Sequence, residues 1–205
     1  MKPLFLLLAA VTADPAEDFN ADSVDLVDAL TCRLEAPAYN GFAMALASGG
    51  ADAPDAKRGW RKLKTDNPYM IEYQLPAPIT LAGHYATSHI GFTANGVVGF
   101  LDQPDPSVIA KPEGIANAMD PEPLIRSLTA SGKVTRAQIE KEITFHKFMG
   151  QKVVVDSQTP PAPGESFGMH KRITHEISNV STAPGKTLYG CSYQIEPTDK
   201  DGKPL

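Results

Sequence analysis

The sequence predicts an α+β fold in which short helices pack on an antiparallel sheet. Three observations favour this fold class. Short segments with apolar residues at helical spacing occur early in the chain and again past its midpoint. Strand-like segments with period-two alternation follow each of them, rather than alternating with helices as in α/β folds. The chain also contains 18 prolines and 16 glycines, which indicate many turns and short elements.

The first half, residues 14–101, opens with a helix predicted over residues 24–31. Its N-cap is expected to be Asp22 or Ser23, because a side-chain oxygen there can accept from the free amides of the first turn. A second, less regular helical segment is expected at residues 36–48.

Strands fill the rest of the first half. Residues 69–75 alternate between two faces, one of which is apolar, as in a strand with one buried side. Strand-like residues 84–93 and 97–101 flank the dipeptide Asn95-Gly96. This dipeptide favours a type I′ hairpin turn, in which both central residues have positive φ.

The second half, residues 120–197, follows a similar order. Residues 124–129 keep the apolar spacing of residues 26–31, and Thr135 begins a second helical segment with Gln138 in the capping-box position. Three strand-like segments come next, at residues 148–156, 169–180 and 187–195.

We therefore interpret the chain as two tandem helix-plus-meander halves. A Pro-rich connector, residues 102–119, separates the halves, and residues 198–205 are expected to form a flexible tail. Short amphipathic helices and hairpins also resemble one another by chance, so chance similarity stays the alternative to duplication. The length fits one domain or two small domains fused into one body.

Residues 1–13 have the layout of a secretory signal peptide. Lys2 supplies a positive charge, residues 3–11 form a short apolar run, and Val11 and Ala13 place small residues before the cleavage position. The run is shorter than the ~20 residues of a membrane helix, and no later segment reaches that length, so no membrane span is predicted. The sequence therefore predicts an exported protein, periplasmic or extracellular. The alternatives are a first core strand or an anchor.

Charge and cysteine content narrow the classes of partner and compartment. The net charge of −5 argues against nucleic acid as a partner. The two cysteines, Cys32 and Cys191, are an even pair, which predicts one disulfide in an oxidising compartment. Such a bond would tie the first helical segment to the last strand-like segment. Two buried free thiols are the alternative.

One catalytic motif occurs in the chain, but in the wrong context. Residues 164–168 satisfy the G-x-S-x-G pattern, which in serine hydrolases turns sharply from a strand into a helix. Here a Pro-rich stretch precedes the pattern and strand-like residues follow it, so we predict a loop and no catalytic serine. No phosphate-binding Gly-rich loop and no other cofactor motif is found, and no cofactor is predicted.

The histidines are weak candidates for a metal site. His84 and His89 are five residues apart, as are His170 and His175, and residues five apart on a regular strand point to opposite faces. Neither pair can then chelate one ion. A cross-pair of His89 with His175 remains if the two hairpins are neighbours. Structural or surface histidines are the favoured interpretation, and no metal is predicted.

The densest charge cluster of the chain spans residues 57–64 and contains the single tryptophan. Trp60 with Arg61, Lys62 and Lys64 can form an aromatic and basic surface for an acidic partner or an anionic sugar polymer. The favoured alternative is a solvated edge strand whose lysines discourage edge pairing, with Trp60 packed inward.

These observations lead to a functional hypothesis of an exported, non-catalytic protein that binds another macromolecule. The partner would be a protein or a cell-envelope macromolecule, and an inhibitor or an immunity protein fits a small chain with one predicted disulfide and no catalytic signature. Two alternatives stay open. One is an envelope hydrolase whose histidine and carboxylate site is assembled by the fold, and the other is a carrier of a small ligand.

The first prediction concerns processing. We expect cleavage after Ala13, because small residues precede that bond and charge begins at Asp14. Edman sequencing of the secreted or periplasmic protein should therefore begin at Asp14. Recovery of the chain only from the cytosol, with Met1 intact, would contradict the export hypothesis.

Overall fold

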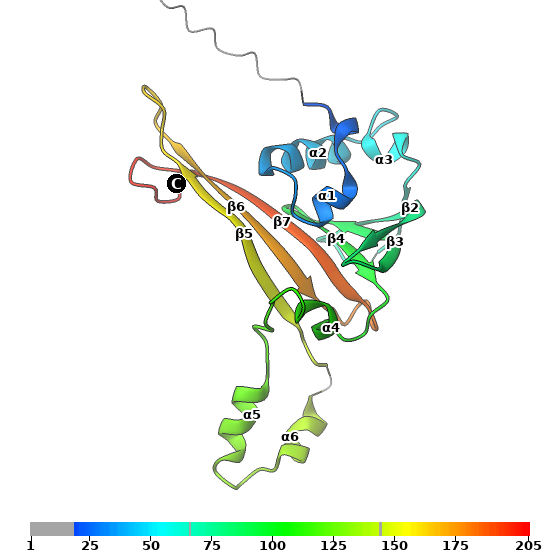
Figure 1. Cartoon of the computed structure of the whole chain (residues 1–205), viewed down its shortest axis with the longest axis vertical. Helices are drawn as coiled ribbons and strands as arrows, with labels where there is room; N and C mark the ends of the chain where they lie inside the picture. The colour runs from blue at the N-terminus through cyan, green and yellow to red at the C-terminus, as the bar shows by residue number, and fades with distance from the viewer. Residues whose placement is uncertain (1–18, 66, 144) are drawn as a thin grey trace, which may run out of the picture.

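The computed structural model describes residues 19–65, 67–143 and 145–205 and confirms the α+β fold class (Figure 1). The predicted signal peptide lies outside these residues. The described strands form one seven-stranded antiparallel sheet in the order β1-β2-β3-β4-β7-β6-β5. The strands are β1 (Arg61–Lys62), β2 (Ile71–Leu81), β3 (Tyr85–Phe92), β4 (Gly96–Leu101), β5 (Met149–Thr159), β6 (Gly168–Ser178) and β7 (Thr187–Thr198). The helical segments are η1 (Ala21–Ser23), α1 (Leu26–Leu30), α2 (Ala36–Ser48), α3 (Pro54–Lys57), α4 (Ser107–Ala110), α5 (Glu122–Thr129) and α6 (Arg136–Glu142).

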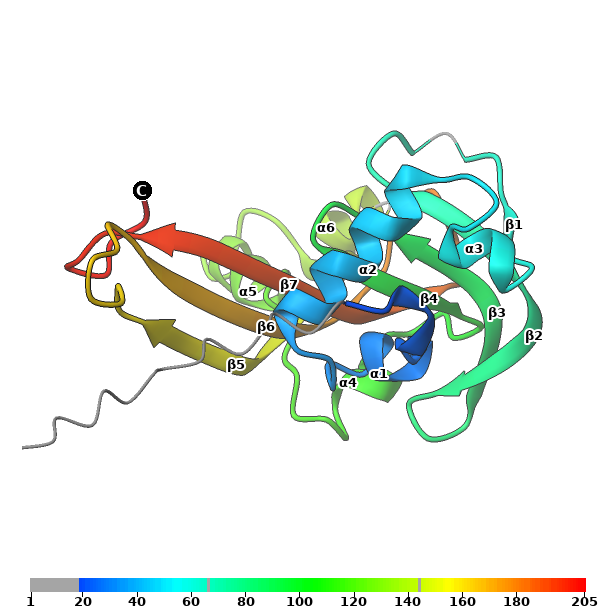
Figure 2. The ribbon, with the colours of Figure 1, turned by 90° about the horizontal axis from the view of Figure 1, so that it is seen from above.

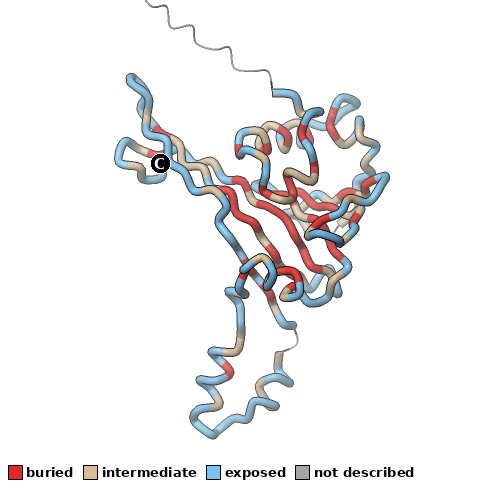
Figure 3. The backbone as a smooth tube through the Cα atoms, in the orientation of Figure 1, coloured by how far each residue is buried: buried red, intermediate tan, exposed pale blue. Residues whose placement is uncertain are grey.

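The first two α-helices cover one face of the sheet, where α2 crosses β7 (Figure 2). In α2, Tyr39, Phe42 and Leu46 are buried, and their spacing of three and four residues places them on one helical face. This apolar face meets the central strands, whose middle residues are also buried (Figure 3). The hydrophobic core therefore lies between the helices and the middle of the sheet.

The cap of α1 differs from the prediction. Asp25, not Asp22 or Ser23, is the N-cap, and its Oδ1 accepts from the amides of Val27 at 2.7 Å and Asp28 at 3.1 Å. Asp22 and Ser23 lie instead in the 3₁₀ turn η1. Asp22, Ser23 and Asp25 can all cap a helix, and Asp25 is the N-cap because its side chain reaches the free amides at the start of α1.

A stacked tyrosine pair joins α2 to the sheet. The rings of Tyr39 and Tyr193 lie 4.2 Å apart and nearly parallel, and both side chains are almost fully buried. The hydroxyl of Tyr193 donates to the carbonyl of Ala29 at 2.7 Å. This carbonyl lies at the C-terminal end of α1, where helix carbonyls lack an intrahelical partner. One side chain of β7 therefore contacts both covering helices.

The structure brings Cys32 and Cys191 to disulfide distance, with their Cα atoms 5.4 Å apart at a sequence separation of 159. Cys32 follows α1 with a φ of 60°. Cys191 lies in β7 and pairs with Val97 on one side and His175 on the other. The cysteine pair therefore links the end of α1 to the centre of the sheet.

The hairpin predicted at Asn95-Gly96 forms, but with other turn residues. The amide of Thr93 donates to the carbonyl of Gly96 at 2.8 Å, so Ala94 and Asn95 make the turn, and neither has a positive φ. Gly96 lies in β4. A Cβ there would stand 2.7 Å from the carbonyl oxygen of Cys191, so the glycine is required for the close approach of β4 to β7.

The helices of the two halves are placed differently. α5 and α6 project away from the sheet as a pair, and most of their residues are exposed (Figure 3). α6 has the predicted capping box between Thr135 and Gln138. Leu124 and Leu128 of α5 remain 62% and 43% exposed, whereas Ile125 is buried. α5 therefore presents an apolar stripe to solvent.

The two halves meet where β4 pairs with β7 in one continuous sheet. The sequences of these strands resemble each other locally, because Val98-Gly99-Phe100 aligns with Tyr189-Gly190-Cys191 and so Gly99 with Gly190. Gly99 pairs with Tyr189, but Gly190 pairs with Val98, so the two glycines lie on opposite faces of the sheet. Duplication of the two halves stays a hypothesis.

Two segments expected to be irregular contribute to the structure. Residues 102–119 include α4, and Ile109 and Ile115 of this stretch are buried in the core. Residues 198–205 fold back, with the Asp199 carboxylate accepting from the amides at positions 201 and 203, at 2.8 Å each. An isolated bridge then pairs Thr198 with Pro204.

The second prediction concerns the cysteine pair. Replacing both residues, Cys32→Ala with Cys191→Ala, should lower the free energy of unfolding by on the order of 4–5 kcal/mol in the chain-entropy model, because the bond closes a very long loop. Urea denaturation measures this difference. Wild-type protein under reducing conditions should unfold at the same urea concentration as the double variant. Intact mass spectrometry showing two freely alkylated thiols in the native protein would contradict the bond.

Candidate functional site

An apolar groove lies between α2 and the sheet edge formed by β2 and the β3–β4 turn. Its volume is about 850 Å³. One wall is the face of α2 that carries Asn40, Ala43, Met44 and Ala47. The other wall and the floor come from residues 68–71, Tyr73 and residues 92–95. No described residue that lines the groove is charged. The groove is therefore suited to an apolar group rather than an ion.

Two large side chains mark the opposite walls of this groove, and both are unusually exposed. Met44 on α2 is 72% exposed, and Tyr69 is 84% exposed. The floor is different, because Tyr73 and Phe92 are only 3% and 6% exposed and belong to the core. An exposed methionine and tyrosine over a packed aromatic floor are features of protein-binding surfaces, where these residue types are enriched.

A local turn holds Tyr69 outward. The Asn67 side chain accepts from the amide of Tyr69 at 3.0 Å, and the Thr65 hydroxyl accepts from the amide of Asn67 at 3.1 Å. Met70 follows and points back toward the sheet, where Gly91 leaves room for it. The turn therefore separates one solvent-facing side chain from one packed side chain.

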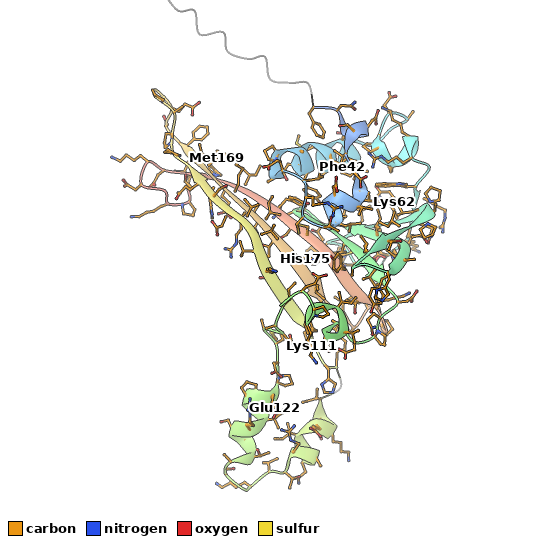
Figure 4. All side chains as sticks on the ribbon, viewed as in Figure 1. Phe42, Lys62, Lys111, Glu122, Met169 and His175 are labelled. Carbon is orange, nitrogen blue, oxygen red and sulfur yellow. A yellow bond between two sulfur atoms is a disulfide. The ribbon has the colours of Figure 1, made fainter. Side chains whose placement is uncertain are left out.

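A basic edge strand lies beside the groove. We use this name for residues 61–64, which include β1 and contain Arg61, Lys62 and Lys64, all exposed. β1 pairs with β2 so that Lys62 stands opposite Tyr73, on the face that forms the groove floor, and Figure 4 marks Lys62 at this edge. Among the described residues, none of these three cations forms an ion pair, although many other cations do.

Trp60 packs inward, as the alternative interpretation of the cluster expected. Its ring lies 5.8 Å from that of Tyr73, 6.1 Å from that of Phe92 and 6.3 Å from that of Phe42. The Arg58 guanidinium lies 5.4 Å from the Trp60 ring and donates to backbone carbonyls of residues 21–24. Trp60 therefore supports the wall of the core, while the neighbouring cations stay in solvent.

The structure does not bring His89 and His175 together. His89 is on β3 and His175 is on β6, and β4 and β7 lie between them, at ~4.8 Å per strand. Among the described residues, no group of three or more potential ligands is arranged to hold a metal ion. The cross-pair is therefore separated by the intervening strands.

Each of three histidines pairs instead with its own carboxylate. His89 lies 2.6 Å from Glu72, and its ring stacks on Phe100 at 3.9 Å. His170 lies 2.7 Å from Asp156, and the two lie on neighbouring strands. Among the described residues, no hydroxyl or thiol bonds to a ring nitrogen of either histidine.

In the third pair the histidine is buried and Glu113 is partly exposed. His175 is 8% exposed, its Nδ1 lies 3.0 Å from Glu113, and its Nε2 has no partner (Figure 4 marks its place on the sheet). Burial lowers the pKa of His175 to about 4, with a smaller contribution from the charge of Lys152. Burial also raises the pKa of Glu113. His175 is therefore neutral at neutral pH, with its Nδ1 facing the Glu113 carboxylate.

The G-x-S-x-G segment lies where the sequence context predicted. Residues 160–167 form the loop between β5 and β6, and a strand rather than a helix follows. Ser166 is exposed in this loop, and the Glu165 carboxylate accepts from the amide of Ala162 at 3.3 Å. The segment therefore lacks the strand-to-helix turn of a nucleophile elbow.

Comparison with protein-family models finds no match, and comparisons with curated proteins and with solved structures find none either. Within the described part of the chain, no helix has both the length and the apolar character needed to cross a bilayer.

The groove itself was missed at the level of sequence. A signal for it is present in α2, where residues 42–47 form an uninterrupted apolar run. A helix that packs one face on a sheet needs apolar residues on that face alone. The additional apolar residues, Ala43, Met44 and Ala47, therefore indicated a second apolar face, and this face lines the groove.

The third prediction separates Trp60 from its basic neighbours. Trp60→Ala should lower the free energy of unfolding by about 2–4 kcal/mol, because it removes a large ring from a packed aromatic cluster. Lys62→Ala should change it by less than about 0.5 kcal/mol, as for an ordinary exposed side chain. Chemical denaturation followed by circular dichroism measures both. Equal effects of the two substitutions would contradict this placement.

The fourth prediction concerns His175. Its imidazole should titrate near pH 4 in an NMR titration of the histidine ring signals, with His175→Asn used to assign the resonance. The unfolded chain binds this proton at a pKa near 6.5. Its contribution to stability is therefore present above pH 6.5 and is lost as the pH falls toward 4. A midpoint near 6.5 in the folded protein would show that the ring is not buried.

Proposed function

We propose that this protein is exported and binds another macromolecule through the groove between α2 and residues 68–71, without catalysing a reaction on it. The observation that carries the proposal is the pair of exposed side chains, Met44 and Tyr69, on opposite walls of an uncharged groove. Large apolar side chains exposed together around a concavity typically mark a surface that a partner covers.

The setting of the groove supports a binding role. Its floor is part of the core, and α2 is held on the sheet by Tyr39 and Tyr193, so the site is rigid before a partner arrives. A preformed site loses less conformational entropy on association than a mobile one. The cysteine pair at disulfide distance is in keeping with the proposed oxidising location. Inhibitor and immunity proteins are binders of this kind.

A carrier of a small apolar ligand is the second candidate, because a volume of about 850 Å³ falls in the range of ligand pockets. A carrier encloses most of the surface of its ligand, whereas Tyr69 and Met44 leave this groove lined by exposed side chains. The macromolecular partner is therefore the stronger proposal.

The fifth prediction tests the groove. Met44→Ser with Tyr69→Ser should weaken capture of a partner from envelope extract at least tenfold, because central Tyr residues carry a large share of interface energy. Affinity capture followed by quantitative mass spectrometry measures this loss. Circular dichroism should show an unchanged fold, since both side chains are exposed.

The matched control is Met119→Ser with Val108→Ser, which removes two apolar side chains exposed elsewhere on the surface. This control should leave capture unchanged. Equal capture by the groove variant and wild type would remove the groove as the binding site. If the groove variant no longer binds an apolar dye but still captures protein as wild type does, the carrier function is favoured.

A further inference from the structure

Resting on the proposed function, we infer that the partner of this groove is an acidic protein segment that inserts an apolar anchor between Met44 and Tyr69. The anchor would sit over Tyr73 and Phe92, and acidic residues beside it would contact the basic edge strand. The chemistry of this partner follows from a juxtaposition in the described part of the chain. A groove lined by no charged residue there lies beside a run of cations that form no ion pair with any described residue.

The charge distribution is the first argument. Arg61, Lys62 and Lys64 fall within four consecutive residues of a chain with a net charge of −5. All three are exposed, and no ion pair among the described residues involves them. An acidic segment is therefore repelled by the surface as a whole and attracted at this edge, which is the condition for electrostatic steering to one site.

The register of β1 is the second argument. Lys62 is the direct cross-strand partner of Tyr73, whose ring forms part of the groove floor. Cross-strand neighbours lie about 5 Å apart, so the backbone of Lys62 lies one strand away from the groove floor. An extended chain advances about 3.4 Å per residue, so acidic residues are expected within about four positions of the anchor.

The shape of the surface distinguishes this partner from a membrane or a nucleic acid. A lipid surface is met by apolar residues that protrude, whereas here they line a concavity with a buried aromatic floor. A nucleic acid would need cations along its path, but the groove is lined by no described charged residue. An apolar small ligand would leave the three cations without a counterpart.

The test is a selection with defined probes. A phage library of random dodecapeptides is panned against the full chain, and the enriched peptides are synthesised and measured by fluorescence anisotropy. We expect enriched peptides to contain one bulky apolar residue with Asp or Glu within about four positions. We also expect their affinity to fall steeply as the salt concentration rises.

Three sets of variants identify the contacts. Lys62→Glu with Lys64→Glu should weaken the affinity for the acidic peptides at least tenfold. Replacing the acidic residues of the peptide by lysine should restore binding to this variant. Met44→Ser with Tyr69→Ser should weaken the binding of both the acidic and the lysine-substituted peptides. The control, Lys133→Glu with Lys141→Glu, makes the same change of net charge on the projecting helices and should have no effect. If the glutamate variant is misfolded by circular dichroism, Lys62→Gln with Lys64→Gln replaces it.

The outcomes separate this inference from the proposed function. Peptides without acidic residues, which depend on Met44 and Tyr69 but not on Lys62, would overturn the inference and leave the groove as a binding site. A library that yields no groove-dependent peptide would overturn both. Binding to vesicles of anionic phospholipid that requires Lys62, with no peptide enriched, would also overturn the inference in favour of a membrane surface.

Discussion

The docking of α1 and α2 on β7 is the interaction on which the rest of the structure depends. Tyr193 stacks on Tyr39 of α2, and its hydroxyl is satisfied by the carbonyl of Ala29 at the end of α1. A buried tyrosine hydroxyl without a partner would cost about 1–3 kcal/mol, so this bond fixes where α1 ends relative to the strand. Cys191 lies two residues before Tyr193 on β7, and Cys32 follows α1. The cysteine pair therefore also links α1 to β7. The position of α2, and with it one wall of the groove, follows from this docking.

The groove results because α2 has more apolar surface than the sheet covers. The face of α2 with Tyr39, Phe42 and Leu46 is buried, and the adjacent apolar face has no covering element among the described residues. The turn at residues 67–70 then raises Tyr69 as a second wall. In the same way α5 keeps the apolar side chains of Leu124 and Leu128 in solvent.

The parts of the fold that depend on local patterns were predictable from sequence. The capping box of Thr135 with Gln138, the hairpin near Asn95 and the pairing of the two cysteines all follow from residue types at short spacing or from parity. The N-cap of α1 was not, because several neighbouring residues are equally able to cap. β2 also continues through Pro76 and Pro78, where its pairing with β3 shifts register, since proline cannot donate to the ladder. The groove needed α2 and residues 68–71 to meet, which no local pattern specifies.

The last strand of the chain, β7, lies at the interior of the sheet, between β4 and β6. Neither the N-terminal meander nor the β5–β6 hairpin can bury its inner edge until β7 has been synthesised, and α1 and α2 have no complete surface to cover before then. Closure of the core therefore waits for the C-terminus of the chain. Contacts so distant in sequence are reached slowly, because the entropy of closing the long loop must be lost before any of them forms. A ribosome-bound or truncated chain that ends before residue 187 is accordingly expected to remain without a closed core, because it lacks the strand that joins β4 to β6.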